Sequence, residues 1–389
     1  MPFRRPIAAL GIALSAAGLA YSLWQGAVLA LAWPGDASSI AKAQRLDPSN
    51  AAIAFRLARV SVMPKWLGDA LQANPRLTAA RIERALALEQ SGDPTAAESD
   101  LLAAAGADHT QLPAWSLANF YLRQRDPARF WEWARRSAAI PGSDRGGIYL
   151  LAWRLEPDAA MLRKRIVPDE PDARLQFLAF LLKQAPAANA AALVPQLVQA
   201  AGPMDERALL DTTDHFLNAG LTIPAAAAWN RLALVAPHRA AALDPTSGPW
   251  LTNPDFRRPS LFRGFDWRFH TVEGVSFARD PARGELSIEL SGHQPETTPL
   301  IDEFLPLGAG RYRFSWRAAA GAIPQDSLVW TVGRRAPTVA SASLSLSSLE
   351  VQIGETAAVR LVLSYRRRPG SPRAAGILRL RALCWERLP

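Results

Sequence analysis

The sequence predicts a multidomain chain with an N-terminal transmembrane helix, an all-α solenoid of helical repeats and a C-terminal all-β sandwich. Three observations predict this fold. Residues 7–33 contain no charged side chain. Apolar residues then recur at helical spacing for about two hundred positions, and beyond residue 249 they alternate as in strands. The predicted parts are residues 1–35, 36–245 and 246–389, and the Pro/Gly-rich stretch 244–249 separates the last two.

The apolar segment 7–33 is long enough to cross a membrane. Its 27 residues would reach about 40 Å as a helix, more than the hydrocarbon core of about 30 Å. Arg4 and Arg5 precede it, so the positive-inside rule puts the N-terminus in the cytoplasm and the bulk of the chain in the periplasm. Residues 30–32, Ala-Leu-Ala, also fit a signal-peptide cleavage site. The length favours a retained anchor, because the apolar core of a signal peptide spans only about 7–15 residues.

The composition limits the partners and the stabilising chemistry. The chain has one cysteine, Cys384, so an internal disulfide is excluded and stability must come from packing. The formal net charge of +9 would suit nucleic acid, but the predicted topology removes that partner and leaves acidic polysaccharide, lipid head groups or an acidic protein. Abundant Ala, Arg and Pro with little Lys are typical of a GC-rich bacterial genome. We therefore predict a single-pass protein of a bacterial inner membrane.

The same helix-breaking pattern occurs at two places in the helical region. Residues 91–94 read Ser-Gly-Asp-Pro and residues 124–127 read Gln-Arg-Asp-Pro, 33 positions further on. In each, the Asp is placed to cap a helix and the Pro to take its first position. A period near 33 or 34 residues predicts repeated helical pairs. The pattern is regular over residues 76–141 and less regular over 36–75 and 142–240.

This pattern resembles the tetratricopeptide repeat family. Phe130 departs from it, but small residues occupy the other close helix crossings: Ala85, Ala97, Ala104, Ala118 and Ser137. Residues 43–51 resemble the end of a second repeat helix, and residues 220–237 span the family's distance from the mid-repeat Gly to the closing Pro. The resemblance implies a concave surface that binds a protein partner. The repeat ending at residues 43–51 requires a preceding helix as its partner. That partner is either the membrane segment itself or missing.

Alternating apolar residues predict short strands in the last third of the chain. Turns rich in Gly and Pro separate them at 281–284, 307–310 and 368–372. With no helices between the strands, an antiparallel sandwich is expected. The expected strands lie around residues 275–277, 286–290, 312–316, 344–346, 359–363 and 378–385.

The order of motifs in this part resembles the jelly-roll carbohydrate-binding modules of the galactose-binding-like class. The matching segments are 253–256 (NPDF), 264–267 (GFDW), 284–288 (GELSI), 304–307 (FLPL) and 310–316 (GRYRFSW). The resemblance implies a jelly-roll sandwich that contacts glycan. Such modules have acidic residues at the positions of Arg257, Arg379 and Arg381. In many of them the acidic residue at the position of Arg257 serves a structural calcium ion. We therefore predict no metal site.

Sugar binding requires an aromatic platform beside planar polar groups. The candidate platforms are Trp267 and Trp330, and their candidate polar neighbours are Arg268, Glu303 and Arg317. The alternative is that these tryptophans belong to the core, which is the reading favoured for Trp316 because it is in register with other apolar residues.

Arginines are concentrated at the end of the chain. Residues 360–387 contain eight Arg and one Glu. Guanidinium groups pair bidentately with carboxylate or phosphate, so an acidic polysaccharide could dock at a predicted hairpin tip. The alternative is a solvated loop whose charges protect a sheet edge. The candidate residues for an anionic ligand are Arg366, Arg367, Arg368 and Arg373.

The sequence offers little for catalysis. The five histidines are scattered, and no metal-binding, nucleophile-elbow or phosphate-loop motif is present. Asp302 and Glu303 are adjacent on a predicted strand and so point to opposite faces. We predict no catalytic residue and no cofactor.

The combined prediction is a non-catalytic component of envelope or exopolysaccharide assembly, in which the repeats bind a protein and the sandwich contacts glycan. Two alternatives remain. The protein could be a scaffold whose sandwich only caps the repeats, or an accessory to a hydrolase or transferase whose active site lies on another chain.

Overall fold

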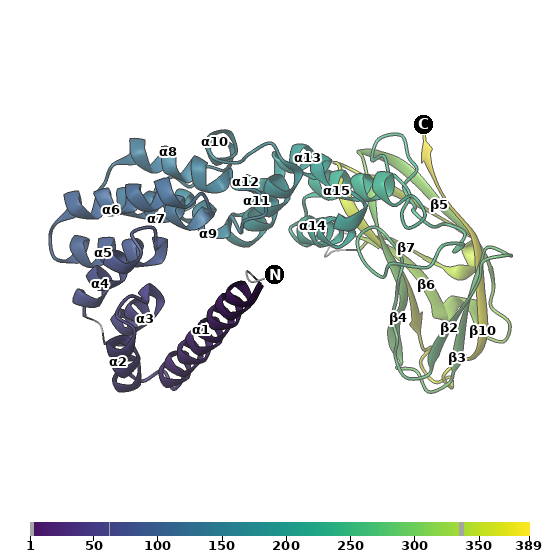
Figure 1. The fold of residues 1–389 in the computed structure, drawn as a ribbon. Coiled ribbons are helices and arrows are strands. Elements are labelled where there is room, and N and C mark those ends of the chain that lie inside the picture. The colour runs from purple at the N-terminus through teal and green to yellow at the C-terminus, as the bar shows by residue number, and fades with distance from the viewer. Residues whose placement is uncertain (1–3, 62, 334–337) are drawn as a thin grey trace. The chain divides into compact units, whose positions relative to one another are not determined.

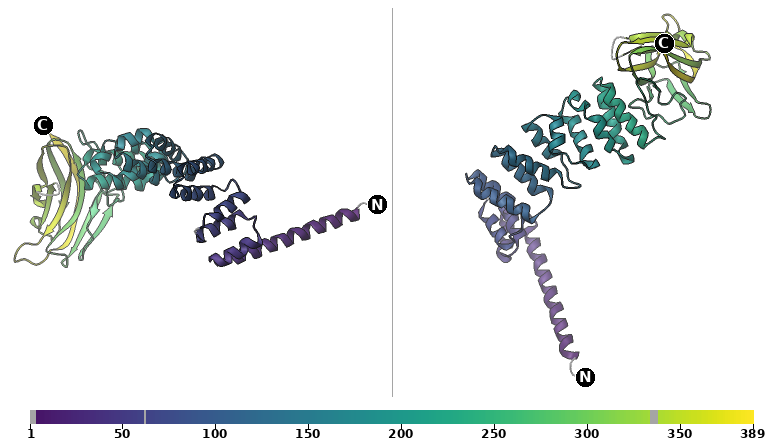
Figure 2. Two further views of the ribbon diagram at one scale, coloured as in Figure 1. Left: turned by 90° about the vertical axis from the view of Figure 1, so that its left-hand side faces the viewer. Right: turned by 90° about the horizontal axis from the view of Figure 1, so that it is seen from above.

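The computed structural model describes residues 4–61, 63–333 and 338–389, so the first three residues of the predicted cytoplasmic end lie outside the described residues. The chain forms two compact units, Met1–Ser143 and Asp144–Pro389. Figures 1 and 2 show helices throughout the first unit, and helices followed by strands in the second.

In its described residues, the first unit contains one long helix followed by seven shorter ones. Figure 1 labels these helices along the chain. Helices α5 and α6 pack against each other, as do α7 and α8. The helices are α1 (Arg4–Ala32), α2 (Ala37–Leu46), α3 (Ala51–Ser61), α4 (Lys65–Ala73), α5 (Thr78–Gln90), α6 (Pro94–Ala107), α7 (Gln111–Arg123) and α8 (Pro127–Ala138).

The capped turns that precede α6 and α8 form as predicted. The side chains of Asp93 and Asp126 each accept the backbone N–H three residues further on, at 3.0 Å in both cases. Pro94 and Pro127 occupy the first positions of α6 and α8, where a missing N–H costs nothing. The predicted helical pairs over residues 76–141 are confirmed. Phe130, the departure from the family pattern, is fully buried.

Helix α1 is apolar and long. Residues Ser15–Ala32 have a mean hydropathy of 1.2, which fits a membrane span or a signal sequence by length and composition. Helix α2 begins at a capped turn, where the Asp36 carboxylate accepts the backbone N–H of Ser39 at 2.9 Å.

The second unit begins with less regular helices and ends its helical part in a clear pair, α14 and α15. Gly220 adopts a positive φ of 76° in the turn between them. The helices are α9 (Gly146–Leu155), α10 (Ala159–Arg165), α11 (Pro171–Gln184), α12 (Ala187–Ala191), α13 (Val194–Leu197), α14 (Glu206–Asn218) and α15 (Thr222–Val235), with 3-10 turns η1 (Val198–Ala200) and η2 (Pro203–Asp205).

Two antiparallel five-stranded sheets complete the unit. Their strand orders are β1-β4-β9-β6-β7 and β2-β3-β10-β5-β8. The predicted sandwich is confirmed at this level. The strands are β1 (Arg268–Phe269), β2 (Val275–Asp280), β3 (Glu285–Ser291), β4 (Thr297–Leu307), β5 (Gly310–Ala319), β6 (Leu328–Gly333), β7 (Thr338–Ser343), β8 (Ser348–Ile353), β9 (Ala357–Arg366) and β10 (Ala375–Leu388), with 3-10 turns η3 (Gln325–Ser327) and η4 (Leu344–Leu346).

One strand prediction was wrong, and one motif of the carbohydrate-binding-module resemblance, at residues 253–256, is not a strand. Residues 344–346 form the turn η4, because the Ser343 side chain accepts the Ser345 N–H and Ser347 takes a left-handed φ of 55°. Residues 253–256 form a turn. The Asn253 side-chain amide donates to the Arg258 carbonyl at 2.8 Å, and its side-chain oxygen accepts the Arg258 backbone N–H at 3.2 Å. The predicted domain boundary after residue 245 falls in the irregular segment between α15 and β1 and stays a prediction.

Candidate functional site

The predicted sugar platforms lie inside the sandwich. Trp267 and Trp330 are both 0 % exposed. The indole N–H of Trp267 donates to the carbonyl of Asn253 at 3.1 Å, and Trp330 packs edge-on against Phe314, with ring centroids 5.0 Å apart. Neither ring presents a face to a ligand, so their prediction as platforms is corrected. Trp316 is core, as expected.

The predicted polar neighbours are not brought together either. Glu303 is fully buried on the core side of β4, whereas Arg317 is exposed on β5 of the other sheet, in register with Arg381. Arg268 is largely buried and belongs to the charged cluster described below. These residues therefore form no joint sugar site.

Glu303 belongs to a buried carboxyl pair. One of its oxygens accepts from the backbone N–H and hydroxyl of Thr252, at 3.2 and 3.3 Å, and its other oxygen has no hydrogen-bond partner among the described residues. Burial and the nearby negative charge of Asp266 raise the pKa of Glu303 well above its usual value. Burial also raises the pKa of Asp266. The surroundings of Glu303 therefore favour its protonated form, and its side chain is closed to solvent.

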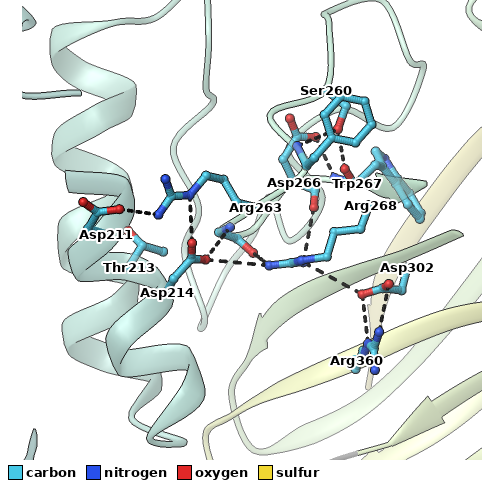
Figure 3. Close-up of polar contacts among 12 residues, drawn as sticks. Asp211, Thr213, Asp214, Ser260, Arg263, Asp266, Trp267, Arg268, Asp302 and Arg360 are labelled. Atoms are coloured by element: carbon cyan, nitrogen blue, oxygen red, sulfur yellow. Dashed lines mark hydrogen bonds and ion pairs between the residues drawn. The ribbon is translucent and has the colours of Figure 1, made fainter. Parts of the chain in front are cut away.

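Asp302, the neighbour of Glu303, points to the opposite face of the sheet, where two arginines and one histidine surround it; Figure 3 shows the two arginines. Arg360 donates to its two oxygens at 2.9 and 3.0 Å, and His270 Nε2 lies 2.5 Å from Oδ1. Arg268 Nη1 lies 3.9 Å from Oδ2. Burial alone would raise the pKa of Asp302, but the Arg360 hydrogen bonds and the surrounding positive charges outweigh it and lower the pKa. A carboxylate so fully engaged is a poor general base.

This charged cluster continues onto helix α14. The guanidinium of Arg263 donates to Asp211 at 2.6 Å and to Asp214 at 2.8 Å (Figure 3). Asp214 also accepts the backbone N–H of Gly264 at 2.8 Å, and Arg268 Nη2 donates to the Gly264 carbonyl at 2.8 Å. The segment 260–267 is thereby fixed to the last helical pair on one side and to β4 on the other.

Close packing reinforces the same junction. Gly264 has a φ of 62°, and a side chain there would lie 2.5 Å from the Trp229 ring of α15. Trp229 is fully buried and meets Phe265 edge-on at 5.9 Å between ring centroids. The sandwich thus covers the apolar surface that the last helical pair would otherwise expose. We refer to the segment 260–267 with Asp211, Asp214 and Trp229 as the junction.

A cleft of about 910 Å³ lies beside the junction, between the α14–α15 turn and the sheet that contains β4. Phe304, Thr331 and Arg360 contribute to its wall. The Arg268 guanidinium lies over the Phe304 ring, 4.9 Å from its centre. The described wall of the cleft therefore contains an aromatic ring, Phe304, and a guanidinium, Arg360, that is held by Asp302. Sequence spacing gave no sign of this cleft.

The arginine-rich tip is only partly free to bind anions. Arg366 and Arg373 are exposed, but Arg367 pairs with Glu296 at 3.2 Å and Arg368 pairs with Asp326. Two of the four candidate cations are therefore already neutralised by the fold.

Cys384, which lies on the last strand, β10, is exposed, although a lone cysteine on an apolar strand is more often buried. In residues 4–61, 63–333 and 338–389, no group of three or more His, Cys, Asp or Glu is placed to hold a metal ion.

Comparison with known proteins adds only coarse similarity. Searches with protein-family models and of curated proteins gave no match to the chain. Among solved structures, one from a functional characterization of Pseudomonas aeruginosa pilF is 16% identical to this chain. The match covers 55% of this chain and 94% of the other chain, with a TM-score of 0.26. A tetratricopeptide repeat protein from Parabacteroides merdae is 12% identical and covers 56% and 93%, with a TM-score of 0.30.

A third similar structure is YrrB, described as a tetratricopeptide repeat protein with an unusual peptide-binding site. It is 13% identical, covers 52% of this chain and 94% of its own, and gives a TM-score of 0.24. At TM-scores this low, none of the three establishes the fold. The assignment of helical repeats here depends on the capped helix pairs of the chain itself.

Proposed function

We propose that the protein is a non-catalytic scaffold, held at a membrane by α1, that binds a protein partner on its helical region while the sandwich caps the last helical pair. The junction is the observation that carries this proposal. It uses the part of the sandwich nearest the helices, including Arg268 and Trp267, for internal contacts rather than for a ligand.

A groove between α11 and α14 supports the partner-binding role. It has a volume of about 290 Å³, and its lining combines four leucines and two alanines with the polar or charged residues Lys183, Asp211, Thr212 and His215. His215 also lines it, and its Nε2 has no hydrogen-bond partner within the described part of the chain. A groove whose lining combines leucines with polar side chains suits an extended or helical peptide with apolar anchors.

Photo-crosslinking tests this role. A photoreactive amino acid is placed in the full chain at Ala179 or Ala208, which line the groove and are exposed, and at Ala160, which is exposed outside it. The scaffold proposal expects one protein adduct of defined mass from the two groove positions and none from Ala160. No adduct, or the same adducts from all three positions, would contradict it.

The second candidate function is a component of envelope or exopolysaccharide assembly on the periplasmic side of an inner membrane, with contact to an acidic polysaccharide. The exposed Arg366 and Arg373 favour it. Titration of the full chain with neutral and acidic polysaccharides, at low and raised salt, separates the two proposals. Saturable, salt-sensitive binding supports glycan contact. A binding signal that stays unchanged with every polysaccharide, at both salt concentrations, supports the scaffold proposal.

A further inference from the structure

Helix α1 changes its surroundings abruptly at Gln25. Every residue from 15 to 24 is exposed. Beyond that point Gln25 is partly covered, and Val28 and Ala32 are only 1% and 2% exposed. Positions 25, 28 and 32 share one face of a helix. The last two turns of α1 therefore have a protein neighbour on one side, whereas residues 15–24 are exposed.

The neighbours are helices α2 and α3. Val28 and Ala32 form one apolar cluster with residues of these helices: Ile40, Ala43, Ile53 and Leu57. The Gln25 amide also donates to Asp47 at 3.2 Å, a carboxylate that is only 4% exposed. A buried carboxylate needs such donors, so this contact fixes the register of α1 against the end of α2.

We infer that α1 is one continuous helix with two environments: lipid up to Trp24, and protein from Gln25 onward. The inference rests on the proposed membrane anchor and adds where the bilayer ends. Residues 7–24 would span about 27 Å as a helix, close to the hydrocarbon core of about 30 Å. Tyr21 and Trp24 then lie at the outer interface, where aromatic residues are enriched.

This division explains the excess length of the apolar segment. The 27 residues from 7 to 33 exceed what a bilayer requires, and the last nine of them are the ones that contact or adjoin α2 and α3. Cleavage after Ala32 would remove Val28 and Ala32 and expose the apolar face formed by Ile40, Ala43 and Ile53. The helix is therefore retained in the mature protein, and it holds α2 and α3 next to the membrane surface.

Cysteine labelling locates the boundary. Gly18 and Gly26 form a matched pair on α1, because a side chain at either position would meet no atom within 4 Å. Each is changed to Cys in a full chain carrying Cys384→Ser, and spheroplasts are treated with a membrane-impermeant maleimide. The inference expects labelling of Gly26→Cys, and of Gly18→Cys only after detergent is added. Equal labelling of the two in intact spheroplasts, or protection of both, would overturn it.

A second measurement tests the packing independently of the bilayer. Val28→Asn breaks the cluster with α2 and α3, whereas Leu29→Asn changes an exposed neighbour that is 54% accessible. Hydrogen exchange in α2 and α3 should become about tenfold faster for Val28→Asn and stay unchanged for Leu29→Asn. Equal exchange in the two variants, or a mature protein that begins at residue 33, would refute the inference. The crosslinking test of the scaffold would be unaffected by either result.

Discussion

The junction predicts that Gly264→Ala destabilises the second unit more than a glycine substitution at a similar backbone conformation elsewhere. Gly264 has a φ of 62°, and its added methyl group would lie 2.5 and 2.8 Å from two atoms of the Trp229 ring. Trp229 is fully buried, and its indole N–H donates to the Ala241 carbonyl at 2.9 Å. The ring is therefore held in place and cannot easily give way.

The magnitude follows from two contributions. A side chain in the left-handed region costs about 1–2 kcal/mol, and overpacking a well-packed core costs about 1–3 kcal/mol more. Gly264→Ala should thus lower the free energy of unfolding by about 2–5 kcal/mol. Gly220, with a φ of 76°, has no atom within 4 Å of the added position, so Gly220→Ala should show only the backbone contribution of about 1–2 kcal/mol.

The assay is hydrogen exchange of α14 and α15 in the full chain, with urea unfolding followed by tryptophan fluorescence. The second variant, Trp229→Leu, makes a double-mutant cycle, in which Gly264→Ala should cost less in the Trp229→Leu background than in the natural chain. If Gly264→Ala and Gly220→Ala are equally destabilising, or the cycle shows additivity, the packing of the sandwich on α15 is not as described.

Three further predictions concern charged groups of the sandwich. Because the pKa of Glu303 is raised in the folded state, its stabilising contribution is complete below the unfolded pKa of about 4.5 and is lost as the pH rises toward the folded value. Glu303→Gln should therefore melt at a higher temperature than the natural chain at pH 8 and at the same temperature near pH 4, and a difference that is independent of pH would contradict this. Asp302→Asn should lower the free energy of unfolding by about 3–5 kcal/mol, because it leaves the guanidinium groups around Asp302 without their counter-charge, and a loss below about 1 kcal/mol in urea unfolding would show that the cluster contributes little. Changing both Arg366 and Arg373 to Ser should abolish any binding of acidic polysaccharide at low salt, while a matched change of Arg367 and Arg368, which already have acidic partners, should weaken it less.

The parts of the fold that depend on local chemistry were predictable from the sequence. The side chains of Asp93 and Asp126 each accept the backbone N–H three residues further on. The local sequence is therefore sufficient to predict where these two helices begin. The burial of Trp330 also left a signal, because Leu328, Trp330 and Val332 alternate with less buried residues along β6. That alternation favours the core, and it outweighs the charged residues that suggested a sugar site.

The junction could not be predicted in the same way. Arg263 and Asp214 are 49 residues apart and lie on different parts of the fold, and neither stands in a pattern that indicates a partner. The alternation at 344–346 misled for a related reason, since the contacts of Ser343 and the left-handed Ser347 decide for a turn. Tertiary contacts of this kind have no periodic signature.

Each end of the helical region is closed by an element that is not part of a repeat. A stack of helical pairs leaves an apolar face at each end that must be covered. The last turns of α1 cover α2 and α3, and the junction covers α14 and α15. Both covers belong to segments for which the sequence had predicted separate roles, membrane insertion for α1 and glycan contact for the sandwich. Removing either one would therefore expose core residues, and a loss of partner binding after such a truncation would not distinguish a binding surface from an unfolded repeat. Point variants in the α11–α14 groove, compared with Gly264→Ala and Val28→Asn, make that distinction, because only the first class should abolish crosslinking without changing hydrogen exchange in the helices.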